Sequence, residues 1–243
     1  MPKLKLLVMT DLHYIGLAKQ ICDIKERNCA GIPKLIERVF EAVEDKEIDL
    51  IVILGDLVDN GNAQGALEDL LVLKTQIKKF NKPIFAAPGN HDSNAEQILD
   101  IFECRENIIE VNGYQLVRFT DKYLSNDICI RNYDEMKKTF AKLNKNEPII
   151  ALQHNPILPK IESTYPYNII DYEKIIDFYS HQNVLLSLSG HFHLGIQPII
   201  ENGVEYITVA ALCEFPYNYS IITFEDKQID VAKCRLDTET VSF

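Results

Sequence analysis

The chain has 243 residues, of which 47% are hydrophobic, so it can bury a sizeable core in one large domain or two small ones. The formal net charge of -11 argues against nucleic acid or an anionic membrane as the main partner, because such binding draws on clusters of lysine and arginine. No stretch approaches the length of a membrane span and the apolar run at residues 6–9 is too short for a signal peptide, so we expect a soluble, cytoplasmic protein.

Strand-like and helix-like segments alternate in the first half of the chain. Apolar runs predict strands at 4–9, 49–54 and 83–87, and amphipathic patterns predict helices from residue 33 and at 67–80. This rhythm is typical of parallel strands with right-handed crossovers, so three successive strand ends should meet at one edge of a sheet.

Antiparallel pairing is expected further along, because Asn112-Gly113 between two apolar runs is a strong hairpin signal. Helices are predicted at 95–102, 135–143 and 172–181, and strands at 108–111, 114–119, 148–152, 184–188, 195–200, 204–209, 220–224 and 228–234. Repeated αβ units followed by a strand-rich end suggest two packed sheets with helices outside. No linker, repeat or low-complexity tract interrupts the pattern, which favours a single domain over residues 1–243.

Two connections are long for a compact domain, residues 14–31 and 155–168. Loops of this length are usually functional or mobile, and the second, rich in proline and tyrosine, is a reasonable lid on the substrate side. The six cysteines lack the close pairing of a disulfide framework, so most are predicted to be reduced, buried thiols. A disulfide or metal role is weighed only for Cys22 and Cys29, which share one loop.

Five loops predicted to follow strands carry polar side chains suited to metal binding, and five of the six histidines lie in them. The stretches are Asp11-Leu12-His13, Gly55-Asp56-Leu57-Val58-Asp59, Pro88-Gly89-Asn90-His91-Asp92, Gln153-His154-Asn155-Pro156 and Gly190-His191-Phe192-His193. Two divalent ions side by side need roughly seven or eight carboxylate, amide and imidazole ligands, with one bridging carboxylate. Seven candidates are present, with Asp56 as the bridge: Asp11, His13, Asp56, Asn90, His154, His191 and His193.

Spacing adds to this interpretation. In extended chain, side chains two residues apart point the same way, so Asp11 with His13, and His191 with His193, are each expected to address one metal centre. Singly, each residue has a structural alternative, such as helix capping by an aspartate or a turn held by Asn90. Jointly, that alternative needs five coincidences at five strand ends. Asp92 is expected to shape its loop, and His181, outside any motif, to be a surface or capping residue.

These motifs, in this order, resemble those of the calcineurin-like metallophosphoesterase superfamily: Asp-x-His, Gly-Asp-x-x-Asp, Gly-Asn-His-Asp, a lone His and Gly-His-x-His. The resemblance runs from Asp11 to His193. It implies a four-layer αββα sandwich of two mixed sheets flanked by helices. It also implies a pair of divalent ions, such as manganese, iron, zinc, cobalt or nickel, and attack on a phosphoester by a metal-bridging hydroxide. One ion would be held by Asp11, His13, Asp56 and His193, and the other by Asp56, Asn90, His154 and His191.

The same resemblance implies catalytic roles for His91 and Asp59. His91 would contact the substrate phosphate, with Asn90, or protonate the leaving oxygen, and the carboxylate of Asp59 would orient its imidazole. Four further substrate contacts are expected from residues near these loops: Tyr14, Asn60, Tyr165 and Phe192.

The predicted substrate class follows from a difference between this sequence and one branch of the superfamily. Where the superfamily's phosphoserine/threonine phosphatases carry a phosphate-gripping arginine, Asp59 is followed by Asn60 and Gly61, and no arginine replaces it in the motif loops. A site without that clamp suits a monoanionic diester better than a dianionic monoester. The His154-x-Pro156 arrangement also looks like the cyclic nucleotide and small-molecule phosphodiesterase branch. Hydrolysis of a small-molecule phosphodiester is therefore predicted, with a phosphomonoesterase or nucleotidase as the alternative.

Two other classes are weighed. A nuclease is less favoured, because the chain is acidic and shows no basic groove signal. A non-catalytic, metal-binding interaction scaffold of the same fold is also considered, but every ligand position and His91 carry a competent residue.

Overall fold

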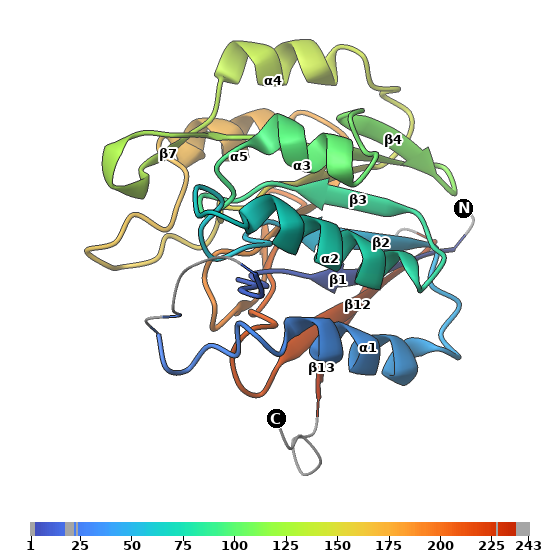
Figure 1. The fold of residues 1–243 in the computed structure, drawn as a ribbon. Helices are drawn as coiled ribbons and strands as arrows, with labels where there is room; N and C mark the ends of the chain where they lie inside the picture. The colour runs from blue at the N-terminus through green and yellow to red at the C-terminus, as the bar shows by residue number, and fades with distance from the viewer. Residues whose placement is uncertain (1–2, 18–21, 23, 227, 237–243) are drawn as a thin grey trace.

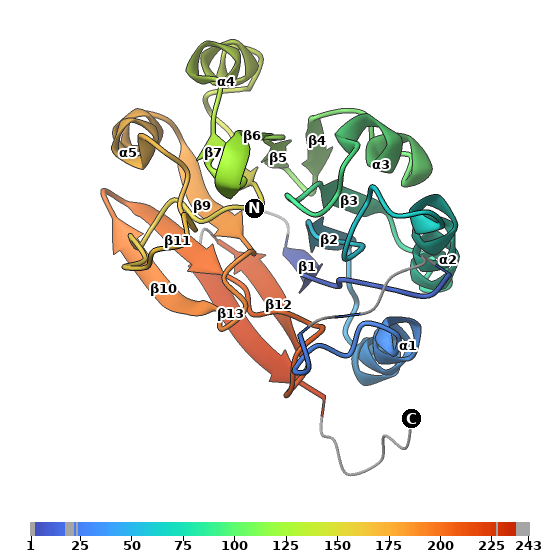
Figure 2. The ribbon, with the colours of Figure 1, turned by 60° about the vertical axis from the view of Figure 1, so that its left-hand side comes forward.

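Two β-sheets lie face to face between outer helices in the computed structural model, which describes residues 3–17, 22, 24–226 and 228–236 (Figures 1 and 2). One buried cluster fills the space between the sheets and reaches the helices α1 and α2, and a second lies between the other sheet and α4 and α5. The four layers are therefore helices, sheet, sheet and helices, and the predicted αββα architecture is confirmed.

The five-stranded sheet has the order β13-β12-β1-β2-β3. The first three strands of the chain pair in parallel, and β12 adds to β1 in antiparallel fashion. The bounds are β1 Leu4–Met9, β2 Leu50–Leu54, β3 Ile84–Ala87, β12 Asn218–Glu225 and β13 Gln228–Arg235. Helices cover its outer face: α1 Ile32–Val43, α2 Ala66–Lys78 and α3 Ala95–Ile101. All five residues of β2 are buried because helices cover one face and the second sheet the other.

The six-stranded sheet has the order β10-β11-β9-β8-β5-β4, parallel in its centre and antiparallel at both edges. The bounds are β4 Ile108–Val111, β5 Tyr114–Arg118, β8 Ile149–Leu152, β9 Val184–Ser189, β10 Ile196–Glu201 and β11 Val204–Thr208. Its outer helices are α4 Tyr133–Phe140 and α5 Tyr172–Ser180. Strand β8 illustrates the pleat: Ile150 and Leu152 face the other sheet, whereas Ile149 and Ala151 pack beneath the helices.

A small substructure between β5 and α4 was not predicted. It comprises β6 Lys122–Tyr123, β7 Cys129–Ile130 and the short 3₁₀ helix Ser125–Asp127. Two-residue strands are too short to leave a periodic signal in the sequence. A buried ion pair between Asp121, just before β6, and Arg131, just after β7, holds the two ends of this substructure together at 2.7 Å. Helix α4 begins two residues earlier than expected because the side chain of Asn132 accepts from the Glu135 amide at 3.2 Å.

The topology brings the carboxyl ends of β1, β2, β3, β8 and β9 to one end of the sandwich. Main-chain hydrogen bonds tie the loops together, from the Asp11 amide to the Gly55 carbonyl at 3.1 Å and from the Gly190 amide to the His154 carbonyl at 2.9 Å. All six cysteines are free, and four of them are buried. Among the residues that the structure describes, no helix is both long and apolar enough to cross a bilayer.

Candidate dinuclear metal centre

Four of the seven predicted ligands lie in left-handed backbone at the strand ends. The φ angles of Asp11, His13, Asp56 and His191 are 51°, 47°, 52° and 68°, in a region that costs a non-glycine residue about 1–3 kcal/mol. The spacing argument assumed extended chain at Asp11-Leu12-His13 and at His191-Phe192-His193. The positive φ angles show that neither stretch is extended. That argument is wrong for His191 and His193, whose rings face different histidines.

Two motif glycines allow the loops to approach closely. A Cβ atom on Gly89 would overlap Oδ1 of Asp56, and one on Gly190 would overlap Oγ1 of Thr10. A larger residue at either position would push apart the loops that carry the candidate ligands.

The first group of side chains, here called the His13 cluster, consists of Asp11, His13 and His193 beside Asp56. Nε2 of His13 lies 3.2 Å from Nε2 of His193 and 3.5 Å from Oδ2 of Asp56. Oδ1 of Asp11 lies 3.4 Å from Nε2 of His193. These atoms offer one cation two imidazoles and two carboxylates.

The second group, the His154 cluster, consists of Asn90, His154 and His191 beside Asp56. Nε2 of His154 lies 3.1 Å from Nδ1 of His191 and 3.2 Å from Oδ1 of Asn90. Burial lowers the pKa of His191 to about 3, and the charge of His154 adds to this, so the ring is neutral near pH 7 and its lone pair can bind a cation.

Asp56 stands between the two clusters. Its Oδ2 lies 3.5 Å from Nε2 of His13 and 3.3 Å from Nε2 of His154. Burial raises the pKa of Asp56, but the adjacent His154 and His13 rings outweigh this and hold the pKa well below its usual value. An ionised carboxylate shared by two histidine clusters has the position required of a bridging ligand.

Hydrogen bonds on the far side of three rings show which nitrogens are free to bind a metal. Nδ1 of His13 donates to Asp59, Nδ1 of His193 to Glu214, and Nδ1 of His154 to the Leu54 carbonyl. Each ring therefore turns Nε2 into the site. Burial lowers the pKa of His154, but Asp56 outweighs this and raises it to about 9, so near pH 7 a proton occupies its Nε2 until a cation displaces it. Oδ1 of Asp11 also lies there, buried and without a hydrogen-bond partner among the described residues. Convergent lone pairs repel one another unless a cation or a proton lies between them, so these residues fit a pair of cations.

His91 lies at the same site, with its ring edge-on to that of His13 at 4.6 Å between centroids. Its amide donates to Oδ1 of Asp56 at 2.9 Å, and its Nδ1 donates to the main-chain carbonyl of Asp59. The prediction that the Asp59 carboxylate orients His91 is therefore wrong, because that carboxylate accepts from His13 at 3.0 Å. Asp92 does shape its loop, since it accepts from the amides of Leu57 at 3.0 Å and Gly89 at 2.9 Å.

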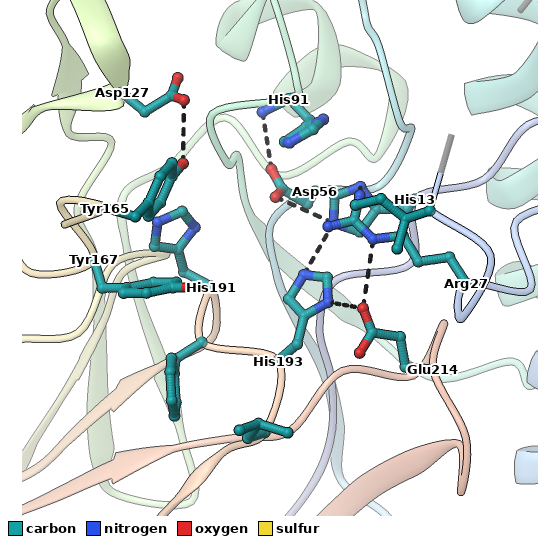
Figure 3. A pocket seen from close by; sticks show the side chains of 13 residues that line it. His13, Arg27, Asp56, His91, Asp127, Tyr165, Tyr167, His191, His193 and Glu214 are labelled. Atoms are coloured by element: carbon teal, nitrogen blue, oxygen red, sulfur yellow. Dashed lines mark hydrogen bonds and ion pairs between the residues drawn. The ribbon is translucent and has the colours of Figure 1, made fainter. Parts of the chain in front are cut away.

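A pocket of about 450 Å³ opens over the clusters (Figure 3). Two of the four further predicted contacts line it, Tyr165 and Phe192. The other two do not line it. Tyr14 is 8% exposed and packs in the core, and Asn60 is exposed and closes a turn by accepting from the Asn62 amide at 3.0 Å. Their nearness to the motifs in sequence did not translate into orientation toward the pocket.

Three charged residues of the pocket were missed by sequence reasoning: Arg27, Asp127 and Glu214. Arg27 lies in the long loop before α1, whose length was the only signal, and Glu214 follows β11 outside every motif. Asp127 accepts from the Tyr165 hydroxyl at 3.1 Å. None belongs to a strand-end motif, so no spacing rule could find them.

Similarity to known proteins agrees with this geometry. The chain is 21% identical over 221 residues to the 3′,5′-cyclic adenosine monophosphate phosphodiesterase CpdA of Haemophilus influenzae, covering 87% of this chain and 77% of that protein. It is 24% identical over 202 residues to an uncharacterized metallophosphoesterase of Helicobacter pylori, covering 79% of this chain but 45% of that protein. The chain thus spans less than half the length of this relative.

The fold has close counterparts among solved structures. A dimetal phosphatase from Danio rerio superposes with a TM-score of 0.77 at 12% identity, covering 95% of each chain. A purple acid phosphatase from yellow lupin, Lupinus luteus, gives 0.67 at 14% identity over 96% of this chain and 52% of that one. A family model assigns the chain to a class of proteins, the metal-dependent phosphoester hydrolases. The model of the calcineurin-like phosphoesterase family matches residues 4–195, so the chain belongs to that family, whose members use two divalent metal ions.

Metal removal should lower the melting temperature, because ions that bind the folded chain and not the unfolded chain stabilise it. A ligand at a hundred times its Kd stabilises a protein by about 2.7 kcal/mol, which corresponds to roughly 5–10 °C at this chain length. Thermal unfolding of metal-loaded protein, with and without a chelator, measures the shift, and added Mn²⁺ should restore it. An unchanged melting temperature would contradict the cation assignment.

Proposed function

We propose that this protein hydrolyses a phosphodiester bond in a small molecule, as a single domain over residues 1–243. The observation that carries the proposal is the position of Oδ2 of Asp56, within 3.5 Å of Nε2 of His13 and 3.3 Å of Nε2 of His154. One carboxylate shared by two histidine clusters is what a pair of adjacent ions requires.

The proposed ligands are Asp11, His13, Asp56 and His193 for one ion and Asp56, Asn90, His154 and His191 for the other. Bound there, two divalent ions would supply Lewis-acid polarisation of the phosphoryl oxygens and a water of lowered pKa. The chain itself supplies orientation. Because Nδ1 of His91 donates to the Asp59 carbonyl, Nε2 is the nitrogen left to face the substrate. In the imidazolium form of the ring, Nε2 carries the proton that passes to the leaving oxygen.

Charge in the pocket supports a diester substrate. Arg27 brings a guanidinium to the wall, but its Nη1 donates to Asp59 at 3.1 Å and its Nε to Glu214 at 3.5 Å. These three side chains together carry one net negative charge, so they add no attraction for a second phosphate charge. A monoanionic diester is less affected by this than a dianionic monoester. The activity named for the Haemophilus influenzae relative points the same way.

The pocket wall supports a substrate with a flat or apolar organic group. The rings of Tyr165 and Tyr167 meet at 4.8 Å between centroids, and Phe192 packs edge-on to Tyr167 at 5.0 Å. Such rings offer faces for stacking. Those of Tyr165 and Tyr167 lie beside His191 at the edge of the proposed centre (Figure 3).

A substrate panel tests the proposal directly. With added Mn²⁺, turnover of bis-p-nitrophenyl phosphate and of a cyclic nucleotide should exceed that of p-nitrophenyl phosphate, about tenfold or more in kcat/KM, or ~1.4 kcal/mol. A clear preference for the monoester would identify a phosphomonoesterase instead. Binding of two ions without turnover of any phosphoester would favour the interaction scaffold.

A further inference from the structure

Arg27 and Glu214 meet beside the His13 cluster although 187 residues separate them in sequence. Arg27 comes from the loop between β1 and α1, and Glu214 from the loop between β11 and β12. Their main chains form an isolated antiparallel bridge, and their side chains are 12% and 24% exposed. Two distant loops are thus joined next to the proposed metal centre.

Glu214 acts on the ring of His193. Its Oε1 accepts from Nδ1 of His193 at 2.5 Å, which leaves Nε2 turned toward His13 (Figure 3). Oδ1 of Asp11 lies 3.4 Å from the same Nε2. A carboxylate behind a ligating imidazole fixes its tautomer and ring orientation and raises its basicity.

His13 has the same arrangement. Its Nδ1 donates to Oδ1 of Asp59 at 3.0 Å, so both histidines of the His13 cluster are backed by carboxylates. Arg27 lies between these two carboxylates, with Nη1 at 3.1 Å from Asp59 and Nε at 3.5 Å from Glu214. One guanidinium therefore holds both carboxylates in place and offsets part of their mutual repulsion.

Within the described part of the chain, no carboxylate stands behind the imidazoles of the His154 cluster. Nδ1 of His154 donates to a neutral acceptor, the Leu54 carbonyl, at 2.5 Å. Nε2 of His191 is buried without a hydrogen-bond partner among the described residues. The two clusters thus differ in the charge that stands behind their imidazoles.

We propose that Glu214 is a positioning residue for His193, fixed by Arg27, and that it makes the His13 cluster the tighter of the two metal sites. This rests on the proposed dinuclear function, because it assigns different affinities to its two ions. Loss of a partner behind a ligand typically weakens metal binding 10- to 100-fold.

Mn²⁺ titration by calorimetry of the full chain, stripped of metal and without substrate, tests the inference. The wild type should bind Mn²⁺ in two steps. His154→Ala should abolish or weaken the weaker step, which would assign that step to the His154 cluster. Glu214→Gln keeps the size of the side chain but removes its charge, and should weaken only the tighter step by about tenfold. Glu214→Asp keeps the charge on a shorter side chain, so its Mn²⁺ affinity in the tighter step should lie between those of the wild type and Glu214→Gln. This variant keeps the test decisive if Glu214→Gln folds poorly.

Asp127→Asn is the matched control, because it removes a carboxylate of the same pocket that bonds Tyr165. Its two Mn²⁺ steps should match the wild type. Unchanged steps in Glu214→Gln, or a loss confined to the weaker step, would overturn the inference while leaving the phosphodiesterase proposal intact. A wild type that binds no Mn²⁺ would overturn both.

Discussion

Replacing Asp56 with asparagine is expected to lower kcat/KM by about a thousandfold, or ~4 kcal/mol of transition-state stabilisation. The substitution preserves the shape of the side chain, including an oxygen that can accept from the His91 amide. It removes the negative charge that lies between His13 and His154, and an amide nitrogen cannot bridge two cations. Both proposed ions should therefore bind more weakly.

Turnover of bis-p-nitrophenyl phosphate and elemental analysis of the dialysed protein measure the two effects together. Asp134→Asn is the matched control, since Asp134 is exposed on the outer helix α4 and should leave both values unchanged. Near-normal turnover with two bound ions in Asp56→Asn would show that this carboxylate is not the bridge.

Replacing His91 with alanine is expected to lower kcat by about 10²–10⁴-fold while both ions stay bound. His91 is proposed to donate a proton to the leaving oxygen, and its Nδ1 is already committed to the Asp59 carbonyl. The residue lies beside the clusters and lines the pocket, so its loss removes an acid without removing a proposed ligand.

His181→Ala is the matched control for this variant, because His181 is exposed at the end of α5 and contacts the Asp177 carbonyl. Metal content, the melting temperature and the pH profile of kcat should be compared for both proteins. Full activity in His91→Ala would show that this histidine is not the acid. Loss of metal with loss of activity would make it a ligand, as its place within 4.8 Å of His13 and Asp56 permits.

The sequence predicts the fold well because its strands are buried on both faces and its helices are amphipathic. Those two patterns place each motif at a strand end, and parallel order brings strand ends together. The seven proposed ligands can therefore be named as one group from the sequence, and the structure gathers them around Asp56.

The directions in which the site's side chains point could not be predicted in the same way. Left-handed backbone at Asp11 and His191 leaves no pattern in residue spacing, so the extended-chain argument failed there. Glu214 and Arg27 lie in loops whose path depends on tertiary contacts, and each is one of many charged residues in the sequence. Asp59 was identified correctly as a neighbour of His91, but the atom that makes the contact was not.

The left-handed conformations at Asp11, His13, Asp56 and His191 bear on which ions the protein can hold. At about 1–3 kcal/mol each, they together approach the net stability of a typical domain, ~5–15 kcal/mol. Glycine would relieve this strain but has no side-chain donor atom for a metal. The packing of the surrounding core must therefore hold these four residues in their left-handed conformation. Ligands held in place by the fold adjust little to the radius of the bound ion. Discrimination among transition metals would then rest on ion size and coordination geometry.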